Sequence, residues 1–215
     1  MSLSVLVMAK APRPGAVKTR LEPLLGPEGC AALQAALIGV TARWAVGAAP
    51  GGAYLAYGPD GAEHDELEPY VPPGIELFRD GEGDLGDRLV FATDFVFAQR
   101  PGPLLVVGTD MPFLSSEHAL AAARALGEAQ VCFGPALDGG YWIVGLREPC
   151  PEVFSLGESW GGADVLERSI DLARGAGLPT ALLGAERDLD DAADARALLA
   201  DPRLPPRIAE ILSGA

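Results

Sequence analysis

A basic segment near the N-terminus is the first candidate for chemistry. Residues 10–20, KAPRPGAVKTR, contain no acidic residue and four cations: Lys10, Arg13, Lys18 and Arg20. The glycine and prolines bend the backbone, so that cationic side chains and backbone amides can face one concavity and hold a di- or triphosphate. The segment lacks the GxxxxGK[ST] pattern of a Walker A loop. A solvated basic loop would explain the segment alone equally well, but its position after the first predicted strand favours phosphate binding.

Carboxylates at two other points of the chain could hold a divalent cation. Asp110 follows the apolar run LLVV and Gly-Thr, and residues 188–194, DLDDAAD, contain four acids in seven residues. Mg²⁺ and Mn²⁺ prefer oxygen ligands and retain waters, so one or two carboxylates plus ligand phosphates make a sufficient site. Asp110 could instead cap the helix that follows Pro112. In the second segment, Asp191 and Asp194 suit helix capping better than metal binding.

Paired glycines give a third candidate, in residues 134–142, GPALDGGYW. Gly139 and Gly140 permit positive φ and close approach of the backbone to a ligand, with Asp138 and two aromatic residues alongside. Asp-Gly between two predicted strands is also a strong hairpin signal, so a plain turn explains the same residues. Residues 81–88, GEGDLGDR, form another glycine-rich segment that could close over a ligand, although its composition alone does not indicate a site.

Alternating apolar runs and amphipathic segments predict the elements that must position these motifs. Strands are expected at residues 3–8, 53–57, 74–78, 103–107, 130–134, 141–145 and 179–183. Helices are expected at residues 27–46, 85–99, 115–126 and 162–174, in 188–200 after a carboxylate-rich loop, and in a short stretch of 201–215. The alternation predicts an α/β fold with a largely parallel sheet and helices on both faces, where ligands bind beyond the carboxyl ends of the strands. The motifs above all fall at that edge.

The composition predicts a single compact domain over residues 1–215. Hydrophobic residues make up 49% and charged residues 21% of the chain, which suits one sizeable core. A net charge of −14 repels polyanions, so we expect no nucleic-acid partner. No apolar stretch approaches the roughly 20 residues that span a bilayer, so no membrane insertion is expected. Three widely spaced cysteines without a CxxC pair suit a cytoplasmic protein, and His64 and His118 are assigned no role.

Five motifs in order carry a resemblance to a known family. They are residues 9–21 (AKAPRPGAVKTRL), 83–89 (GDLGDRL), 108–112 (GTDMP), 134–141 (GPALDGGY) and 188–191 (DLDD). With them the chain resembles, over nearly its whole length, a bacterial family of small GT-A-type glycosyltransferase-like proteins that are distantly similar to 2-phospho-lactate guanylyltransferase. The resemblance implies a Rossmann-like three-layer α/β/α fold of the nucleotide-diphospho-sugar transferase type with a mainly parallel sheet.

The resemblance also implies roles for single residues. Lys18, Asp110 and Asp190 would be catalytic, and the two aspartates would hold Mg²⁺ or Mn²⁺. The nucleotide would be bound by Ala9, Lys10, Gly15, Lys18, Thr19, Arg20, Gly83, Asp84, Leu85, Gly86, Arg88 and Thr109. The acceptor would contact Asp138, Gly139, Gly140, Tyr141 and Trp160. The family usually has a small hydroxyl pair after this tryptophan, whereas this chain has Gly161 and Gly162 and so lacks any contact made by that hydroxyl.

Two reactions fit this set of residues, and both need a nucleotide donor and a small-molecule acceptor. In glycosyl transfer, the acceptor attacks a nucleotide-sugar while the metal, Lys18 and Arg20 neutralise the departing diphosphate, and the family's naming favours this reaction. In nucleotidyl transfer, a phosphorylated small molecule attacks the α-phosphorus of a nucleoside triphosphate. The basic loop and the single aspartate Asp110, in place of Asp-x-Asp, favour the second reaction. A nucleotide-sensing module without turnover is a third hypothesis, against which the retention of Asp110 and Asp190 argues.

Overall fold

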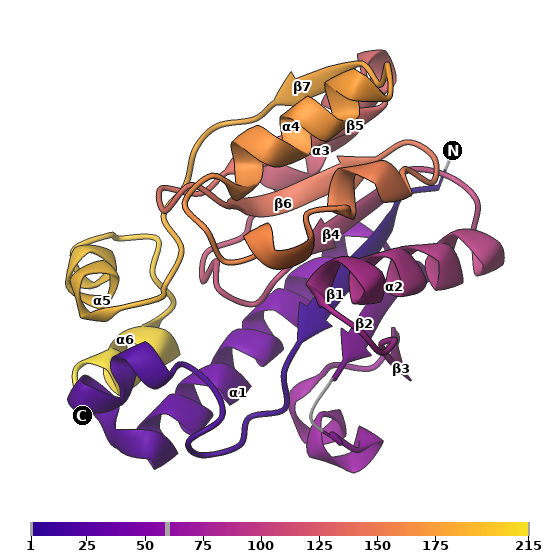
Figure 1. Cartoon of the computed structure of the whole chain (residues 1–215). Helices are drawn as coiled ribbons and strands as arrows, with labels where there is room; N and C mark the ends of the chain where they lie inside the picture. Colours follow the sequence, from indigo (N-terminus) through magenta and orange to yellow (C-terminus); the bar gives the residue numbers. More distant parts are fainter. Residues whose placement is uncertain (1, 59–60, 215) are drawn as a thin grey trace.

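A seven-stranded sheet forms the centre of the computed structural model, which describes residues 2–58 and 61–214 (Figure 1). The strands are β1 Ser4–Ala9, β2 Ala53–Tyr57, β3 Ile75–Arg79, β4 Leu104–Val107, β5 Val131–Pro135, β6 Tyr141–Leu146 and β7 Thr180–Leu182. Their order is β3-β2-β1-β4-β6-β5-β7. Strand β6 runs antiparallel to β4 and β5, and the other pairs are parallel. The sheet is therefore mainly parallel, as the sequence predicts.

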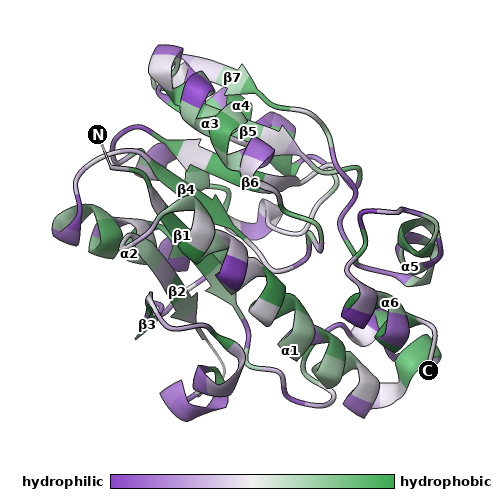
Figure 2. Ribbon diagram, turned by 180° about the vertical axis from the view of Figure 1, so that it is seen from behind, coloured by the Kyte–Doolittle hydropathy of each residue, from purple (hydrophilic) through white to green (hydrophobic). Residues whose placement is uncertain are grey.

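Helices cover both faces of the sheet and give a three-layer α/β/α arrangement. They are α1 Glu22–Ala48, α2 Leu85–Gln99, α3 Ser116–Glu128, α4 Val165–Gly175, α5 Ala192–Leu199 and α6 Pro206–Leu212. Side chains of α1, α3, α5 and α6 share one core with Val5 and Val7, whereas those of α2 and α4 share the other with Leu6. Successive residues of β1 thus point into opposite cores, which is why this strand reads as a continuous apolar run. Figure 2 shows the apolar colour concentrated on the strands between the helices.

The predicted helices and strands are present, with boundaries that differ by a few residues. Helix α1 begins at Glu22 rather than at residue 27, because Gly26 adopts φ 67° and joins two helical stretches across a kink before Pro27. The part of the chain that the structure describes also contains five short 3-10 helices that were not predicted: η1 Thr19–Leu21, η2 His64–Glu66, η3 Glu68–Tyr70, η4 Pro151–Phe154 and η5 Gly157–Ser159. Segments of three or four residues are too short to leave a hydrophobic period in the sequence.

The helical segment Thr19–Ala48 corrects one expectation. It is 30 residues long and contains a window with a mean hydropathy of 1.3, so by length and composition it could cross a membrane. The statement that no apolar stretch approaches that length was therefore wrong. In the structure 56% of that window is buried, and Leu33, Leu37 and Trp44 of the segment lie in the core beneath the sheet. Core packing accounts for its apolar composition.

Candidate active site

The loop between β1 and η1, which we call the phosphate loop, ends at a conformationally strained residue. Lys18 adopts φ 50° and ψ 35°, and it is the only non-glycine residue with positive φ in the part of the chain that the structure describes. A left-handed conformation costs such a residue about 1–2 kcal/mol. Strain of this kind is concentrated at functional sites, where the surrounding structure holds it in place. Here it places the lysine side chain in the interior, with only 6% of its surface exposed.

The ammonium group of Lys18 lies between two carboxylates at the carboxyl edge of the sheet. Its Nζ is 2.7 Å from Oδ1 of Asp110 and 3.3 Å from Oδ1 of Asp190. It also donates a hydrogen bond of 2.5 Å to the carbonyl oxygen of Leu189. Burial lowers the pKa of Lys18, but the attraction of the two aspartates outweighs burial and raises it overall. The lysine is therefore a charged group that joins three separate segments of the chain.

Asp110 follows β4 and belongs to this cluster rather than to a helix end. Ser115 occupies the N-cap position of α3, so the alternative that Asp110 caps this helix is wrong. The Asp110 side chain is 48% exposed. Its backbone carbonyl accepts a 2.8 Å hydrogen bond from the amide of Leu189. The end of β4 is thus fixed to the segment that carries Asp190.

Three carboxylates form a second cluster that includes Asp190. Oxygen atoms of Asp138, Asp188 and Asp190 all lie within 4.8 Å of one another. Burial, followed by the charges of Asp138 and Asp190, raises the pKa of Asp188 to about 7. Burial also raises the pKa of Asp190, although Lys18 opposes this shift. Asp110, Asp138, Asp188 and Asp190 together form what we call the carboxylate corner. Lys18 pairs with Asp110 and Asp190 and so balances part of its negative charge.

Sequence reasoning missed the part that Asp188 plays in this cluster. Asp138 was assigned to the acceptor site and Asp190 to the metal, and nothing in chain order indicated that the β5–β6 turn meets the segment before α5. The pattern Asp-Leu-Asp was the available signal. Leu189 is fully buried in the core, so in an extended segment the aspartates on either side of it face the opposite way, toward the cleft.

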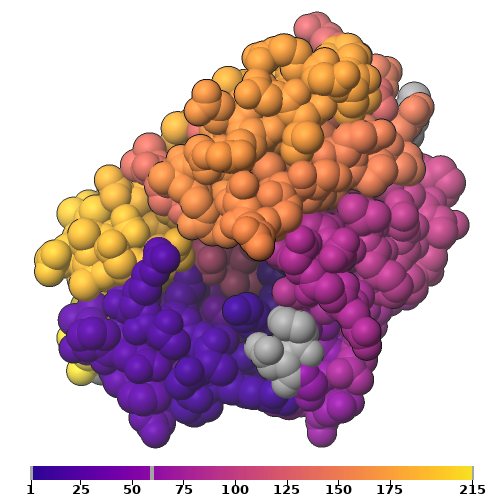
Figure 3. Space-filling model, in the orientation of Figure 1, coloured from indigo at the N-terminus to yellow at the C-terminus, as the bar shows by residue number. Residues whose placement is uncertain are grey.

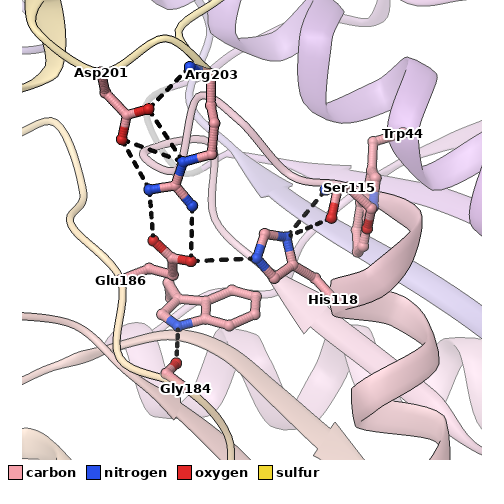
Figure 4. Close-up of polar contacts among 8 residues, drawn as sticks. Trp44, Ser115, His118, Gly184, Glu186, Asp201 and Arg203 are labelled. Carbon is pink, nitrogen blue, oxygen red and sulfur yellow. Dashed lines mark hydrogen bonds and ion pairs between the residues drawn. The ribbon is translucent and has the colours of Figure 1, made fainter.

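Residues 183–191, which we call the aspartate strap, are held in place along their length. Trp142 donates from Nε1 to the carbonyl of Gly184 over 3.2 Å. Glu186 bridges to Ala136 through the backbone. Its carboxylate accepts hydrogen bonds from Arg203 at 3.0 and 3.2 Å, and Nε2 of His118 lies 3.4 Å away (Figure 4). The strap therefore presents its aspartates from a fixed backbone.

His118, which the sequence left without a role, takes part in this anchorage. Its Nδ1 accepts a 3.0 Å hydrogen bond from the amide of Ser115, so in the neutral ring the proton lies on Nε2 and faces Glu186 (Figure 4). At the other end of the strap, Asp191 caps α5 by accepting from the amides of Ala193 and Asp194. The capping role expected of Asp191 is therefore present.

A cleft of about 560 Å³ opens at these clusters. Figure 3 shows the molecule hollowed between the indigo N-terminal region and the orange segment that includes α4. The predicted site residues that line the cleft are Ala9, Lys10, Lys18, Thr19, Arg20, Leu85, Arg88, Thr109, Asp110, Asp138, Gly140, Tyr141, Trp160 and Asp190. Gly161 and Gly162 also line it, as do Asp188 and Trp142. Residues predicted from five separate motifs thus meet at one concavity.

Five residues predicted to bind a ligand do not line the cleft: Gly15, Gly83, Asp84, Gly86 and Gly139. Asp84 caps α2 by accepting from the amide of Asp87. Gly139 has φ 95°, and a side chain there would lie 1.9 Å from the carbonyl oxygen of Ala163. The glycines allow turns and close packing of backbone against backbone, which produces the same sequence signal as close approach to a ligand.

Arg88 lies in the cleft, but its charge is already paired. Its Nε donates a 2.9 Å hydrogen bond to Oδ2 of Asp80, and Nη2 contacts the same oxygen. The Asp80 side chain is only 1% exposed. Sequence reasoning did not single out Asp80, because a lone acid at the end of β3 resembles any solvated residue. The pair leaves Arg88 with less positive charge for a ligand than its position suggests.

We expect Gly86→Ala to lower stability even though alanine favours helices. A methyl group at residue 86 would lie 2.3 Å from the carbonyl oxygen of Phe154 and 3.0 Å from Nε1 of Trp160. Overpacking against backbone costs about 1–3 kcal/mol, which corresponds to a fall in melting temperature of roughly 2–10 °C for a chain of this size. Gly47→Ala, where the new methyl group would meet nothing within 4 Å, is the matched control and should leave the melting temperature unchanged or raise it. Equal melting temperatures for the two variants would contradict this packing.

Solved structures of similar fold support the architecture. A candidate nucleotide-diphospho-sugar transferase from Desulfovibrio desulfuricans G20 has a TM-score of 0.86 at 28% identity, covering 100% of this chain and 95% of that chain. CMP:2-keto-3-deoxy-manno-octonic acid synthetase in complex with CTP has a TM-score of 0.54 at 14% identity, covering 93% and 99%. The 4-diphosphocytidyl-2C-methyl-D-erythritol synthase from Anaerococcus prevotii DSM 20548 has a TM-score of 0.53 at 14% identity, covering 86% and 87%. The last two similarities show the fold alone.

A family model described as "Uncharacterized protein conserved in bacteria (DUF2064)" matches residues 41–161, more than half of the 215 residues. The matched region contains Asp110, Asp138, Tyr141 and Trp160. Lys18 and Asp190 lie outside it. None of the curated proteins is similar enough in sequence to match the chain.

Proposed function

The chain belongs to the bacterial family DUF2064 and is a transferase, and we propose that it transfers a sugar from a nucleotide-sugar to a small-molecule acceptor with a divalent metal ion. One observation carries the proposal. A strained, buried lysine is held between two aspartates at the carboxyl edge of a mainly parallel sheet, beside a cleft of about 560 Å³. This edge is where open α/β sheets bind their ligands, and a volume of this order suits a ligand of nucleotide size.

The residues of this corner fit a hard divalent cation such as Mg²⁺ or Mn²⁺. Asp110, Asp138, Asp188 and Asp190 offer carboxylate oxygens, the ligands that such cations prefer. Asp190 would be a ligand in either of two arrangements: with Asp110, as the sequence implies, or with Asp138 and Asp188, whose oxygens lie within 4.8 Å of it and of each other. Burial raises the pKa values of Asp188 and Asp190, and repulsion by neighbouring carboxylates adds to this shift. A bound cation would offset that repulsion and neutralise the diphosphate as it leaves.

The protein's own groups would bind and orient the donor. Lys10, on the phosphate loop, and Arg20, in η1 directly after it, are exposed and line the cleft, so they are placed to contact the phosphates. Lys18 would contribute its positive charge from the protein interior, between Asp110 and Asp190. Positioning of this kind, together with electrostatic stabilisation of a departing diphosphate, supplies most of the catalysis in reactions where the protein forms no covalent bond.

Nucleotidyl transfer is the second candidate. It is favoured by the single aspartate after β4, where Asp110 follows Gly-Thr without a second acid two residues away. In that reaction the same cations would offset the charge of the transferred phosphoryl group and of pyrophosphate. The two reactions differ in what they release: a nucleoside diphosphate in glycosyl transfer and pyrophosphate in nucleotidyl transfer.

A ligand panel tests the proposal directly. The protein is heated with nucleoside triphosphates, nucleoside diphosphates and nucleotide-sugars, each with Mn²⁺ and with a chelator. We expect a nucleotide-sugar and its nucleoside diphosphate to raise the free energy of unfolding by RT ln(1 + [L]/Kd), and with it the melting temperature, in metal-containing samples, and less with chelator. Selective stabilisation by a triphosphate, with release of pyrophosphate, would favour nucleotidyl transfer. No stabilisation by any nucleotide would contradict the nucleotide site itself.

We also infer a cytoplasmic location. Cys30, Cys132 and Cys150 are free and buried. Burial raises the pKa of the Cys132 thiol to about 11, so this group remains protonated at neutral pH. Free thiols without disulfide partners are typical of proteins kept in a reducing compartment.

A further inference from the structure

The positive charge of the cleft lies on the donor side. Its cationic residues are Lys10, Lys18, Arg20 and Arg88. Lys18 is paired with two aspartates and Arg88 with Asp80. Within residues 2–58 and 61–214, neither Lys10, on the phosphate loop, nor Arg20, in the adjoining η1, forms an ion pair. The charge available to a ligand is therefore placed where the diphosphate of the proposed donor would bind.

The facing side of the cleft, which we call the acceptor wall, has the opposite character. It consists of the cleft-lining residues between 138 and 165, chief among them Asp138, Tyr141, Trp160 and Val165. No lysine, arginine or histidine occurs among the described residues of this wall. Asp138 is its ionisable acid, and Asp188 lies beside it. The wall itself offers no positive charge to a phosphate or carboxylate group, and the charge of the proposed metal ion would be shared by the aspartates and the diphosphate of the donor.

Aromatic rings and a carboxylate give the acceptor wall a pattern suited to hydroxyl compounds. The rings of Tyr141 and Trp160 meet edge to face, with centroids 6.4 Å apart, and so offer a rigid apolar surface. Oδ1 of Asp138 accepts from the amide of Gly140 over 2.9 Å. An ionised carboxylate has further lone pairs and can only accept, so its natural partners are donors such as hydroxyl groups. A pyranose ring has both an apolar face and hydroxyl donors.

From the proposed function and this distribution of charge we infer that the acceptor is an uncharged or cationic sugar-like hydroxyl compound, and not a phosphorylated or carboxylated one. In the transfer, the acceptor oxygen forms a bond to the anomeric carbon of the donor sugar. The bond from that carbon to the diphosphate breaks, and its electron pair remains on the diphosphate. The hydroxyl proton is released to solvent. The inference rests on the acceptor wall, so it can fail while the nucleotide site stands.

The test uses matched acceptors that differ in charge. Protein loaded with Mn²⁺ and the nucleoside diphosphate selected by the panel is titrated by calorimetry with neutral methyl glycosides of gluco, galacto and manno configuration. The bound configuration is then compared with its 2-amino, 6-carboxylate and 6-phosphate forms. We expect the neutral or amino sugar to bind at least about tenfold more tightly than either anion. Tighter binding by the phosphate or carboxylate, or no binding by any neutral or amino sugar, would overturn the inference.

Variants separate this inference from the proposed function. Trp160→Ala should weaken sugar binding about tenfold or more and leave the Kd of the nucleoside diphosphate unchanged, whereas Trp160→Phe should retain part of the sugar affinity. Asp138→Asn keeps an acceptor for the Gly140 amide and should raise the affinity for the 6-phosphate relative to the neutral sugar. If no nucleoside diphosphate binds, the proposed function fails. The sugar titration is then read on the free protein, whose acceptor wall is the same.

Discussion

Replacement of Asp190 by asparagine is expected to lower kcat/KM of the proposed transfer by about a thousandfold, equivalent to about 4 kcal/mol of transition-state stabilisation. Asp190 is the residue common to both carboxylate clusters. It lies 3.3 Å from the ammonium of Lys18 and within 4.8 Å of the oxygens of Asp138 and Asp188. Asparagine preserves the shape and one acceptor oxygen but removes the charge that would hold a metal ion. The measurement is a turnover assay across a Mn²⁺ titration, with the melting temperature of each sample.

The free energy of unfolding of Asp190→Asn should not fall. Lost turnover without lost stability would identify the role of Asp190 as functional and not structural. Burial raises the pKa of Asp190, so ionisation of this carboxyl disfavours the folded state once the pH exceeds its ordinary value. A neutral amide removes that cost at neutral pH. Asp191→Asn is the matched control: the neighbouring residue is an exposed N-cap of α5, and asparagine caps helices as well as aspartate does. An Asp190→Asn protein with normal, metal-responsive turnover would refute the role of Asp190.

An element could be predicted from the sequence wherever its own residues contained the pattern of apolar residues, caps or turns that defines it. Strand β4 is a run of four apolar residues followed by Gly-Thr-Asp, which places Asp110 at the carboxyl edge whatever the neighbouring strands are. Helix α2 begins and ends where predicted, at Leu85 and Gln99, because Asp84 is a strong cap and the apolar spacing is helical. The kink at Gly26 left no such signal, because a glycine before proline inside an apolar stretch fits either a helix start or an interruption.

The sequence motifs indicated which residues belong to the candidate site, but not which of these residues contact one another. Lys18, Asp110 and Asp190 were named from their motifs, yet which carboxylates share an oxygen-lined corner depends on how the strands pair. The turn at Asp138 reaches Asp188 because β6 lies between β4 and β5, and because the strap continues from β7 next to β5. The same limit applies to the ion pair of Arg88: its partner Asp80 lies outside the helix that carries Arg88, and only the packed structure brings them together.

Lys18→Met is expected to lower stability in the absence of metal, and Mn²⁺ is expected to restore it. Methionine keeps an unbranched side chain at the left-handed position, so backbone strain is unchanged, but Asp110 and Asp190 lose their shared cation and the carbonyl of Leu189 loses a donor. Leaving such groups unpaired costs about 1–3 kcal/mol each. Because the ammonium occupies the space between the two carboxylates, its removal should also raise the Mn²⁺ affinity of the nucleotide-free protein about tenfold.

Lys10→Met is the control for this last prediction, because it removes a positive charge from the same cleft without removing the partner of Asp110 and Asp190. Lys10 is exposed on the same loop and lines the same cleft, so its loss should weaken nucleotide binding without changing the melting temperature or the affinity for Mn²⁺. Both lysines would then act on the phosphates, while Lys18 alone would also act as the charge that keeps the carboxylate corner intact before ligands arrive. Calorimetric Mn²⁺ titrations of the two variants decide the matter: a lower Mn²⁺ affinity in Lys18→Met would mean that the lysine organises the aspartates rather than competing with the metal for them.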